Sequence, residues 1–248
     1  MTPLSPKICA VGSKRSCAAV YTAALAALSC LHSADAEAHP VVFEQGTAIM
    51  GHHHGDMAAL EVIHSPRWWY GLGIEAERTK DSSIVLARAN ALVWRGNFPD
   101  LQSNLYLGLD AGMAWGPMTG HGGAHHRSTT NLDTSREGER SRVQAWRIEW
   151  DAEDRQFYGK GRFTRIFKDE RAFSNETVTR LGLAPYKAQA EEPALWTMLE
   201  WTTNSDSKFR VTEHEITPLV RYFYRNMLFE VGSSLSGKLT FNYMIHYF

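Results

Sequence analysis

Two groups of histidines are the residues best suited to chemistry. The first lies in the stretch 50–57, which reads Met-Gly-His-His-His-Gly-Asp-Met, and the second in the glycine-rich stretch 116–127. Imidazole with thioether suits copper or silver, whereas imidazole with carboxylate suits zinc or nickel. We therefore predict a metal site, with copper or zinc as candidates and no other cofactor. The predicted ligands are His52, His53, His54, Asp56, His121, His125 and His126.

A second interpretation of both groups stays open. Histidine and glycine are ordinary polar residues of loops, and an exposed histidine tract binds metal without any defined ligand geometry. The two groups can cooperate only if the fold brings them to the same side of the molecule, so the elements that carry them decide between the interpretations.

Groups suited to catalysis are few. A lipid-directed hydrolase needs a nucleophile beside a base that a third group orients. Ser65 follows His64, and His214 stands between Glu213 and Glu215. Neighbouring residues of a strand point to opposite faces, so neither arrangement forms a site by itself. We expect no catalytic residues and no enzyme, with a lipid-modifying enzyme kept as an alternative.

The first 38 residues have the pattern of a secretory signal peptide. Lys7, Lys14 and Arg15 precede an apolar run over 17–31, which leads into the small-residue stretch 34–38. This order is typical of a cleaved leader. Two cleavage sites overlap, after Ala36 or after Ala38, and we favour cleavage before residue 39. We expect residues 39–248 to form one domain.

All three cysteines, Cys9, Cys17 and Cys30, lie in this leader, so no disulfide can form in residues 39–248. Lipidation at Cys30 is a minor alternative, because Ala27-Leu28-Ser29 is a poor lipobox. The leader holds three of the 26 basic and two of the 27 acidic residues, which leaves 23 against 25. This balance does not favour a nucleic-acid partner.

The remaining chain lacks an apolar run of about 18 residues, the length that a membrane-spanning helix needs. It shows period-two alternation instead. Over 105–115, Leu, Leu, Leu, Ala, Met and Trp occupy the odd positions, and Tyr, Gly, Asp, Gly and Ala the even ones. Repeated segments of about ten residues with this alternation are typical of an antiparallel transmembrane β-barrel of the outer membrane. A soluble β-sandwich or barrel is the alternative.

Eleven strands are indicated directly. The expected ranges are 56–65, 68–79, 84–97, 103–116, 141–151, 156–168, 175–187, 194–203, 210–224, 226–235 and 239–248. Bacterial barrels have even strand numbers, so we add 41–50 as a twelfth strand, with ten strands as the alternative. Twelve strands place 51–55 and 117–140 in connections on the external side. The two histidine groups would then share one mouth of the barrel.

Aromatic residues near the expected strand ends support a membrane location, because amphipathic rings favour the bilayer interface. They include Trp68, Trp69, Trp94, Trp115, Trp150, Tyr222, Tyr224 and Tyr247. The expected inward charges are nearly balanced in sign. Their default role is structural pairing, and a small polar pore is the functional interpretation.

The last ten residues, Leu239–Phe248, resemble the C-terminal strand of outer-membrane proteins, which the membrane's assembly machinery reads. Phe248 lies one step out of the expected register. The stretches 180–186, 216–221 and 241–246 resemble, more loosely, small outer-membrane barrels that accompany heavy-metal efflux systems. The resemblance implies metal handling by association.

The sequence thus predicts an outer-membrane barrel that binds or passes a small solute, with a divalent or heavy metal ion as the first candidate. Its expected partners are the lipid bilayer and the assembly machinery. A structural or adhesive barrel is the alternative, and the oligomeric state stays open.

Overall fold

A computed structural model of the chain describes residues 40–116, 140–188, 192–206 and 212–247. Within these ranges the chain forms twelve antiparallel strands. The predicted signal peptide lies outside them and stays a prediction. The strands are β1 (Thr47–His54), β2 (Met57–Arg67), β3 (Tyr70–Arg78), β4 (Ser83–Asn97), β5 (Gln102–Trp115), β6 (Arg140–Glu153), β7 (Phe157–Lys168), β8 (Arg171–Leu183), β9 (Ala194–Asp206), β10 (Thr212–Tyr224), β11 (Met227–Ser233) and β12 (Leu239–Tyr247).

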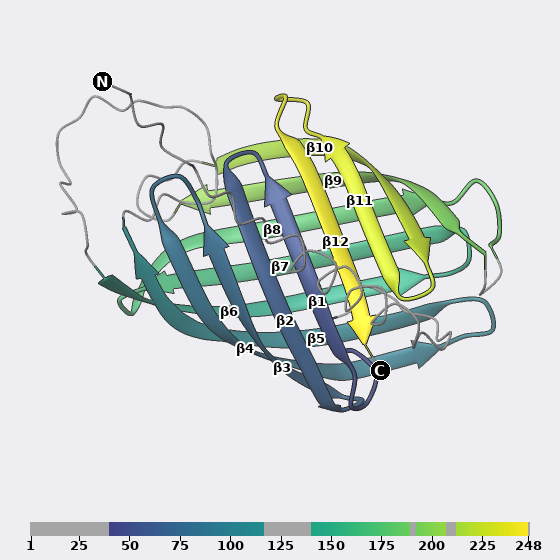
Figure 1. Cartoon of the computed structure of the whole chain (residues 1–248), viewed down its shortest axis with the longest axis horizontal. Helices are drawn as coiled ribbons and strands as arrows, with labels where there is room; N and C mark the ends of the chain where they lie inside the picture. The colour runs from purple at the N-terminus through teal and green to yellow at the C-terminus, as the bar shows by residue number, and fades with distance from the viewer. Residues whose placement is uncertain (1–39, 117–139, 189–191, 207–211, 248) are drawn as a thin grey trace, which may run out of the picture. The chain divides into compact units, whose positions relative to one another are not determined.

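Each strand pairs with its neighbours in the chain, and β1 pairs with β12, which closes the sheet into an up-and-down barrel. Thr47 lies opposite Tyr247 and His54 opposite Thr240 along the closing seam, where β1 and β12 run side by side (Figure 1). Closure leaves no strand with an unpaired edge. It confirms the prediction of twelve strands rather than ten.

The start of β1 and the end of β12 lie at the same end of the barrel. We call this the periplasmic end, because both termini of bacterial single-chain barrels lie there. Its connections include Trp68–Trp69 and Arg225–Asn226. The opposite, external end carries the 24-residue connection 116–139 and the turn Gly55–Asp56.

The prediction for the first strand was wrong by several residues. β1 runs over Thr47–His54, so His52 to His54 belong to a strand and not to the external turn. The polar tract fits a strand because His52 and His54 point inward, while His53 points outward with Ile49 and Gly51. Gly51 is required on the outer face, where the ring of Tyr243 lies across it and a Cβ would come within 2.1 Å of Tyr243 Cε1.

β8 also begins four residues earlier than predicted. The tight turn Asp169–Glu170 precedes it, with φ values of 47° and 67°. Such positive φ values at both central residues are typical of two-residue hairpin turns, which usually hold glycine. The strand ends at Leu183, shortly before Pro185, which cannot donate a hydrogen bond to a ladder.

The outer surface of the barrel is apolar. Leu72, Ile74, Leu109 and Leu181 are each at least half exposed. The aromatic residues predicted near strand ends lie there: Trp68 and Trp69 in the β2–β3 turn, and Trp115 at the external end of β5. An apolar outside with aromatic residues at both rims is the surface of an outer-membrane barrel, and we assign the protein to the outer membrane. The described part of the chain contains no helix that is long and apolar enough to cross a membrane.

The inner surface contains both apolar clusters and charges. One cluster of buried residues lies toward the external ends of β4 to β7, a second toward the periplasmic ends of β7 to β10, and a third joins Val41 to β4 and β5. The residues 40–46 that precede β1 therefore do not extend the strand. Val41 and Val42 are buried, and the Val42 N–H donates to Ser65 Oγ at 3.0 Å.

Candidate functional site

The lumen is the candidate functional site, because alternate positions of every strand bring polar and charged side chains into it. Acidic residues outnumber basic ones at the inward positions of the described strands, which departs from the near balance expected from the sequence. The acidic residues are Glu61, Glu75, Glu77, Asp110, Glu149, Asp151, Glu153, Glu176, Glu200, Asp206, Glu213, Glu215 and Glu230. The basic residues are Arg88, Arg95, Arg147, Lys160, Arg162, Lys168, Arg171, Arg180 and Arg221.

One charge network centres on Arg88 of β4. Its guanidinium contacts Glu75 on the neighbouring β3, and lies 2.8 Å from Glu61 Oε2 on β2 and 3.1 Å from Asp110 Oδ1 on β5. Arg147 of β6 lies 3.5 Å from the same Asp110 oxygen. Three carboxylates thus surround one guanidinium, and each is at most 16% exposed at its side chain. Charges removed from water to this degree persist only when they are paired.

Arg147 also ties the wall to the segment before β1. It crosses β5 at Gly108, where a Cβ would lie 2.8 Å from its Nη2, and donates to Asn90 Oδ1 at 2.7 Å. Asn90 in turn donates to the Pro40 carbonyl at 3.0 Å. The start of the described chain is therefore held against the inside of the barrel by a buried and a partly buried hydrogen bond.

A second network covers the opposite part of the wall. Arg180 of β8 donates to Glu200 at 2.9 Å and to Glu230 of β11 at 3.0 Å, so it spans two intervening strands. Arg221 donates to the same Glu230 at 2.8 Å. Arg221 also lies over the ring of Tyr158, 4.5 Å from its centroid, which suits a guanidinium.

The lumen is not sealed from solvent. The side chain of Arg162 is 33% exposed although it lies 2.7 Å from Glu176. Lys160 is 16% exposed beside Glu149, and Arg180 and Glu200 are 15% and 14% exposed. Water therefore reaches charged groups of both signs inside the barrel.

The histidines of β1 reach this network near the external end. His52 Nδ1 contacts Asn242 Oδ1, and Asn242 donates to Glu230 at 2.7 Å. His54 Nε2 lies 2.9 Å from Glu215 Oε2, and its Nδ1 lies 2.7 Å from the Thr240 hydroxyl. The two imidazoles are nearly parallel, with centroids 6.3 Å apart.

The predicted metal ligands are thus divided. His52 and His54 share the lumen, His53 is exposed on the outer face and Asp56 is exposed in the β1–β2 turn. His121, His125 and His126 lie outside the described residues. No group of three or more histidine, cysteine, aspartate or glutamate side chains converges in a metal-binding arrangement within the part of the chain that the structure describes. Sequence reasoning missed Glu215 as a neighbour of His54, because the two are 161 residues apart.

The neighbouring residues considered for catalysis point to opposite faces of the barrel, as the alternation of strand residues predicted. His64 is exposed on the outside and lies 3.1 Å from the Thr47 hydroxyl, whereas Ser65 is buried inside. His214 is exposed beside Thr203, while Glu213 and Glu215 point inward. Neither pair assembles a nucleophile with its base.

Comparison with known proteins gives matches only among solved structures. No protein-family model and no curated protein matches the chain. The KdgM porin, in a complex with disordered oligogalacturonate, is 12% identical with a TM-score of 0.47, covering 82% of this chain and 98% of that one. OmpT, an outer membrane protein of Vibrio cholerae, is 7% identical with a TM-score of 0.34, covering 82% and 95%. Residue roles do not transfer at such identities.

Proposed function

We propose that this barrel passes small solutes across the outer membrane and prefers those with positive charge. The observation that carries the proposal is the excess of carboxylates over basic groups at the inward positions of the strands. Arg88 pairs with Glu75, and Arg180 pairs with both Glu200 and Glu230. Because these basic groups are each neutralised by one or more carboxylates, the remaining acidic residues leave the lining with a net negative charge. Acidic rings are the usual lining of cation-selective pores.

The geometry supports passage through a narrow, wet lumen. Low-dielectric walls focus the field of the lining charges and raise the local concentration of counter-ions. The paired Arg162 and Glu176 are exposed by 33% and 19%, so a permeating ion meets fixed charges without displacing the buried network around Arg88.

Transport is tested by solute uptake into liposomes. The refolded barrel is reconstituted, and swelling rates are compared for cationic, neutral and anionic solutes of similar size. We expect the cationic solute to enter fastest, and the preference to fall when Glu176 and Glu200 are both changed to Gln. The matched control is Asp56→Asn, which removes an acid outside the lumen. Equal rates for all solutes, or faster anion entry, would reject the proposed preference.

A divalent metal ion is the second, finer candidate for the cargo. It is supported by His54 and Glu215, whose facing atoms are 2.9 Å apart, and by the loose resemblance to barrels that accompany heavy-metal efflux systems. Imidazole with carboxylate suits zinc. Lys238 Nζ lies 3.3 Å from Glu215 Oε1 and would have to move aside, and water or Thr240 would complete the coordination.

Metal binding is tested by calorimetry with zinc and copper on the refolded barrel. We expect a site of micromolar affinity, worth about 8 kcal/mol, that is lost in His54→Ala. His53→Ala is the matched control, because His53 is exposed on the outer face. Equal weak binding by all three proteins would reject metal capture at this mouth and leave the transport proposal intact.

A further inference from the structure

The outer face of β3 to β6 contains a hollow that neither the lumen nor the metal candidate uses. Ala89 and Ala91 occupy successive outward positions of β4, and the residues opposite them on β3 and β5 are much larger. Leu72 lies opposite Ala89 on β3, and Leu109 lies opposite it on β5. A run of methyl groups between taller side chains leaves a furrow along β4. Its volume is about 540 Å³.

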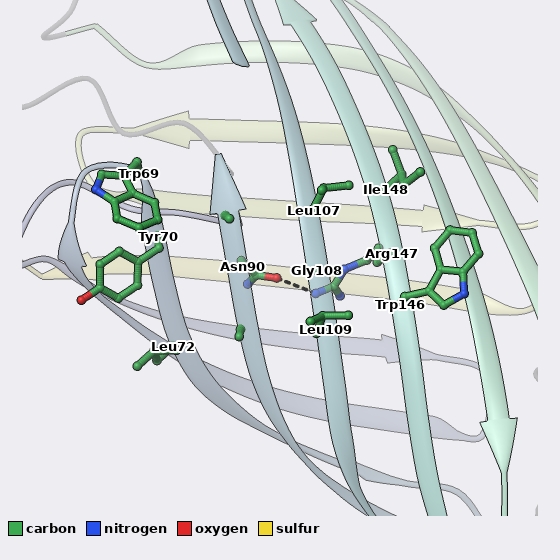
Figure 2. A pocket seen from close by; sticks show the side chains of 12 residues that line it. Trp69, Tyr70, Leu72, Asn90, Leu107, Gly108, Leu109, Trp146, Arg147 and Ile148 are labelled. Carbon is green, nitrogen blue, oxygen red and sulfur yellow. Dashed lines mark hydrogen bonds between the residues drawn. The ribbon is translucent and has the colours of Figure 1, made fainter. Parts of the chain in front are cut away.

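The walls of this furrow are almost wholly apolar. Leu72, Leu107, Leu109, Trp146 and Ile148 line it around the small residues of β4, and Figure 2 shows these side chains spread over β3 to β6. Leu109 is 66% exposed and Leu72 is 51% exposed. The polar lining residues Asn90 and Arg147 belong to the inner face, where they bind each other at 2.7 Å.

One edge of the furrow lies at the membrane interface. Trp69 and Tyr70 line it where the β2–β3 connection turns at the periplasmic end, and their rings pack together with centroids 4.7 Å apart. Trp69 is 46% exposed. Aromatic side chains with a polar edge favour the level of the lipid headgroups. The furrow therefore begins near the headgroups of the inner leaflet and extends into the hydrocarbon region.

We propose that this furrow, lined by Leu72, Ala89, Ala91, Leu107, Leu109 and Trp146, holds an acyl chain of an inner-leaflet phospholipid as a retained lipid. The furrow is a depression within the apolar belt that already faces the bilayer, so it is continuous with an interface that lipid covers. A single acyl chain is narrow enough to enter a groove one strand wide, whereas a second barrel would present a broad convex wall. Dispersion contacts accumulate along a chain that is enclosed on both sides.

Retention would follow from shape rather than from charge. A chain on the flat outer wall is touched from one side, whereas a chain in the furrow is touched by both the β3 and the β5 side chains and by the β4 methyls below. The polar edge of Trp69 lies where a phosphate or glycerol oxygen of the same lipid would be. This proposal does not rest on transport through the lumen.

The first test uses native mass spectrometry of the full barrel released from phospholipid nanodiscs. We expect one phospholipid retained per barrel, reduced at least tenfold when Ala89 and Ala91 are both changed to Leu. Ala76→Leu is the matched control, because Ala76 is an outward residue of β3 outside the furrow. Equal retention by all three proteins would overturn the proposal, and so would protein dimers without lipid.

A second test needs no variant and keeps the proposal falsifiable if the double substitution prevents folding. The wild-type barrel is reconstituted with phospholipid that carries a photoreactive group on its acyl chain, and the cross-linked peptides are mapped. Cross-links enriched on β3 to β6 around Ala89 support the furrow. An even distribution over the outward residues of all strands would contradict it. Neither result depends on conductance, so failure here is separate from failure of the transport proposal.

Discussion

The inner and outer faces of the same strands follow different physical rules. On β5, Leu107 and Leu109 are 45% and 66% exposed on the outside, whereas Tyr106 and Asp110 are 1% and 5% exposed inside. Outside, each side chain interacts separately with lipid, so its contribution depends on its own polarity and depth. Inside, each charge depends on partners from other strands. The outer face therefore anchors the barrel in the membrane, and the inner face carries the charges on which the proposed cation preference rests.

The largest effect should come from breaking the inner network at its centre. Arg88→Met leaves Glu61, Glu75 and Asp110 without their shared base, which should lower the free energy of unfolding by about 3–5 kcal/mol. The measurement is urea unfolding of the barrel folded into lipid vesicles. Arg165→Met is the matched control, because Arg165 points outward and lies over the Phe167 ring. Similar losses in both variants would contradict the distinction between the faces.

A charge placed on the outer face should cost slightly less. Leu109→Arg puts a cation on the lipid surface near the centre of β5, and arginine at the bilayer midplane costs roughly 2–4 kcal/mol. Leu239→Arg, at the external end of β12, should cost only about 0–1 kcal/mol. The same unfolding assay compares the two. Equal costs would mean that Leu109 does not lie deep in the bilayer.

Neutralising one inward carboxylate at the external mouth should lower stability less than the two preceding changes, and it tests whether the inner face sets the cation preference. Glu215→Gln removes a carboxylate that His54, Ser236 and Lys238 contact, with 19% of its side chain exposed. We expect about 1 kcal/mol of lost stability, since partly exposed ion pairs contribute little, together with a fall in cation preference measured by liposome swelling. Unchanged preference would show that this mouth does not contribute to selectivity.

The smallest effect is expected for Lys238→Met in the β11–β12 turn. Its side chain is 27% exposed and its ammonium lies 3.3 Å from Glu215 Oε1, so stability should change by less than about 1 kcal/mol. The same change removes the ammonium beside Glu215 and leaves the Ser236 hydroxyl in place, so it should strengthen zinc binding by severalfold, measured by calorimetry. Weakened zinc binding would contradict coordination of the metal by Glu215.

The sequence was sufficient to predict the barrel because alternation repeats in every strand. The outward leucines of β5, the inward Arg147 and Glu149, and the even strand number are confirmed. The first strand was misplaced because a run of three histidines reads as a polar turn. Only the partners Asn242, Thr240 and Glu215, supplied by distant strands, make it a suitable lumen-facing segment.

The candidate site was less predictable. Alternation identifies which residues point inward, but not which ones meet across several strands. Arg180 and Glu230 are 50 residues apart, and β9 and β10 separate their strands. The acidic excess was also hidden, because basic residues such as Arg142 and Arg165 lie on the outer face and balance the charge of the whole chain.

The most direct test of cation preference is the zero-current potential of the barrel in a planar lipid bilayer under a KCl gradient. An acidic lumen predicts a potential with the sign of cation selectivity, which moves toward zero when Glu176 and Glu200 are changed to Gln. A potential with the sign of anion selectivity, or one that is the same in the wild-type barrel and this variant, would contradict the account.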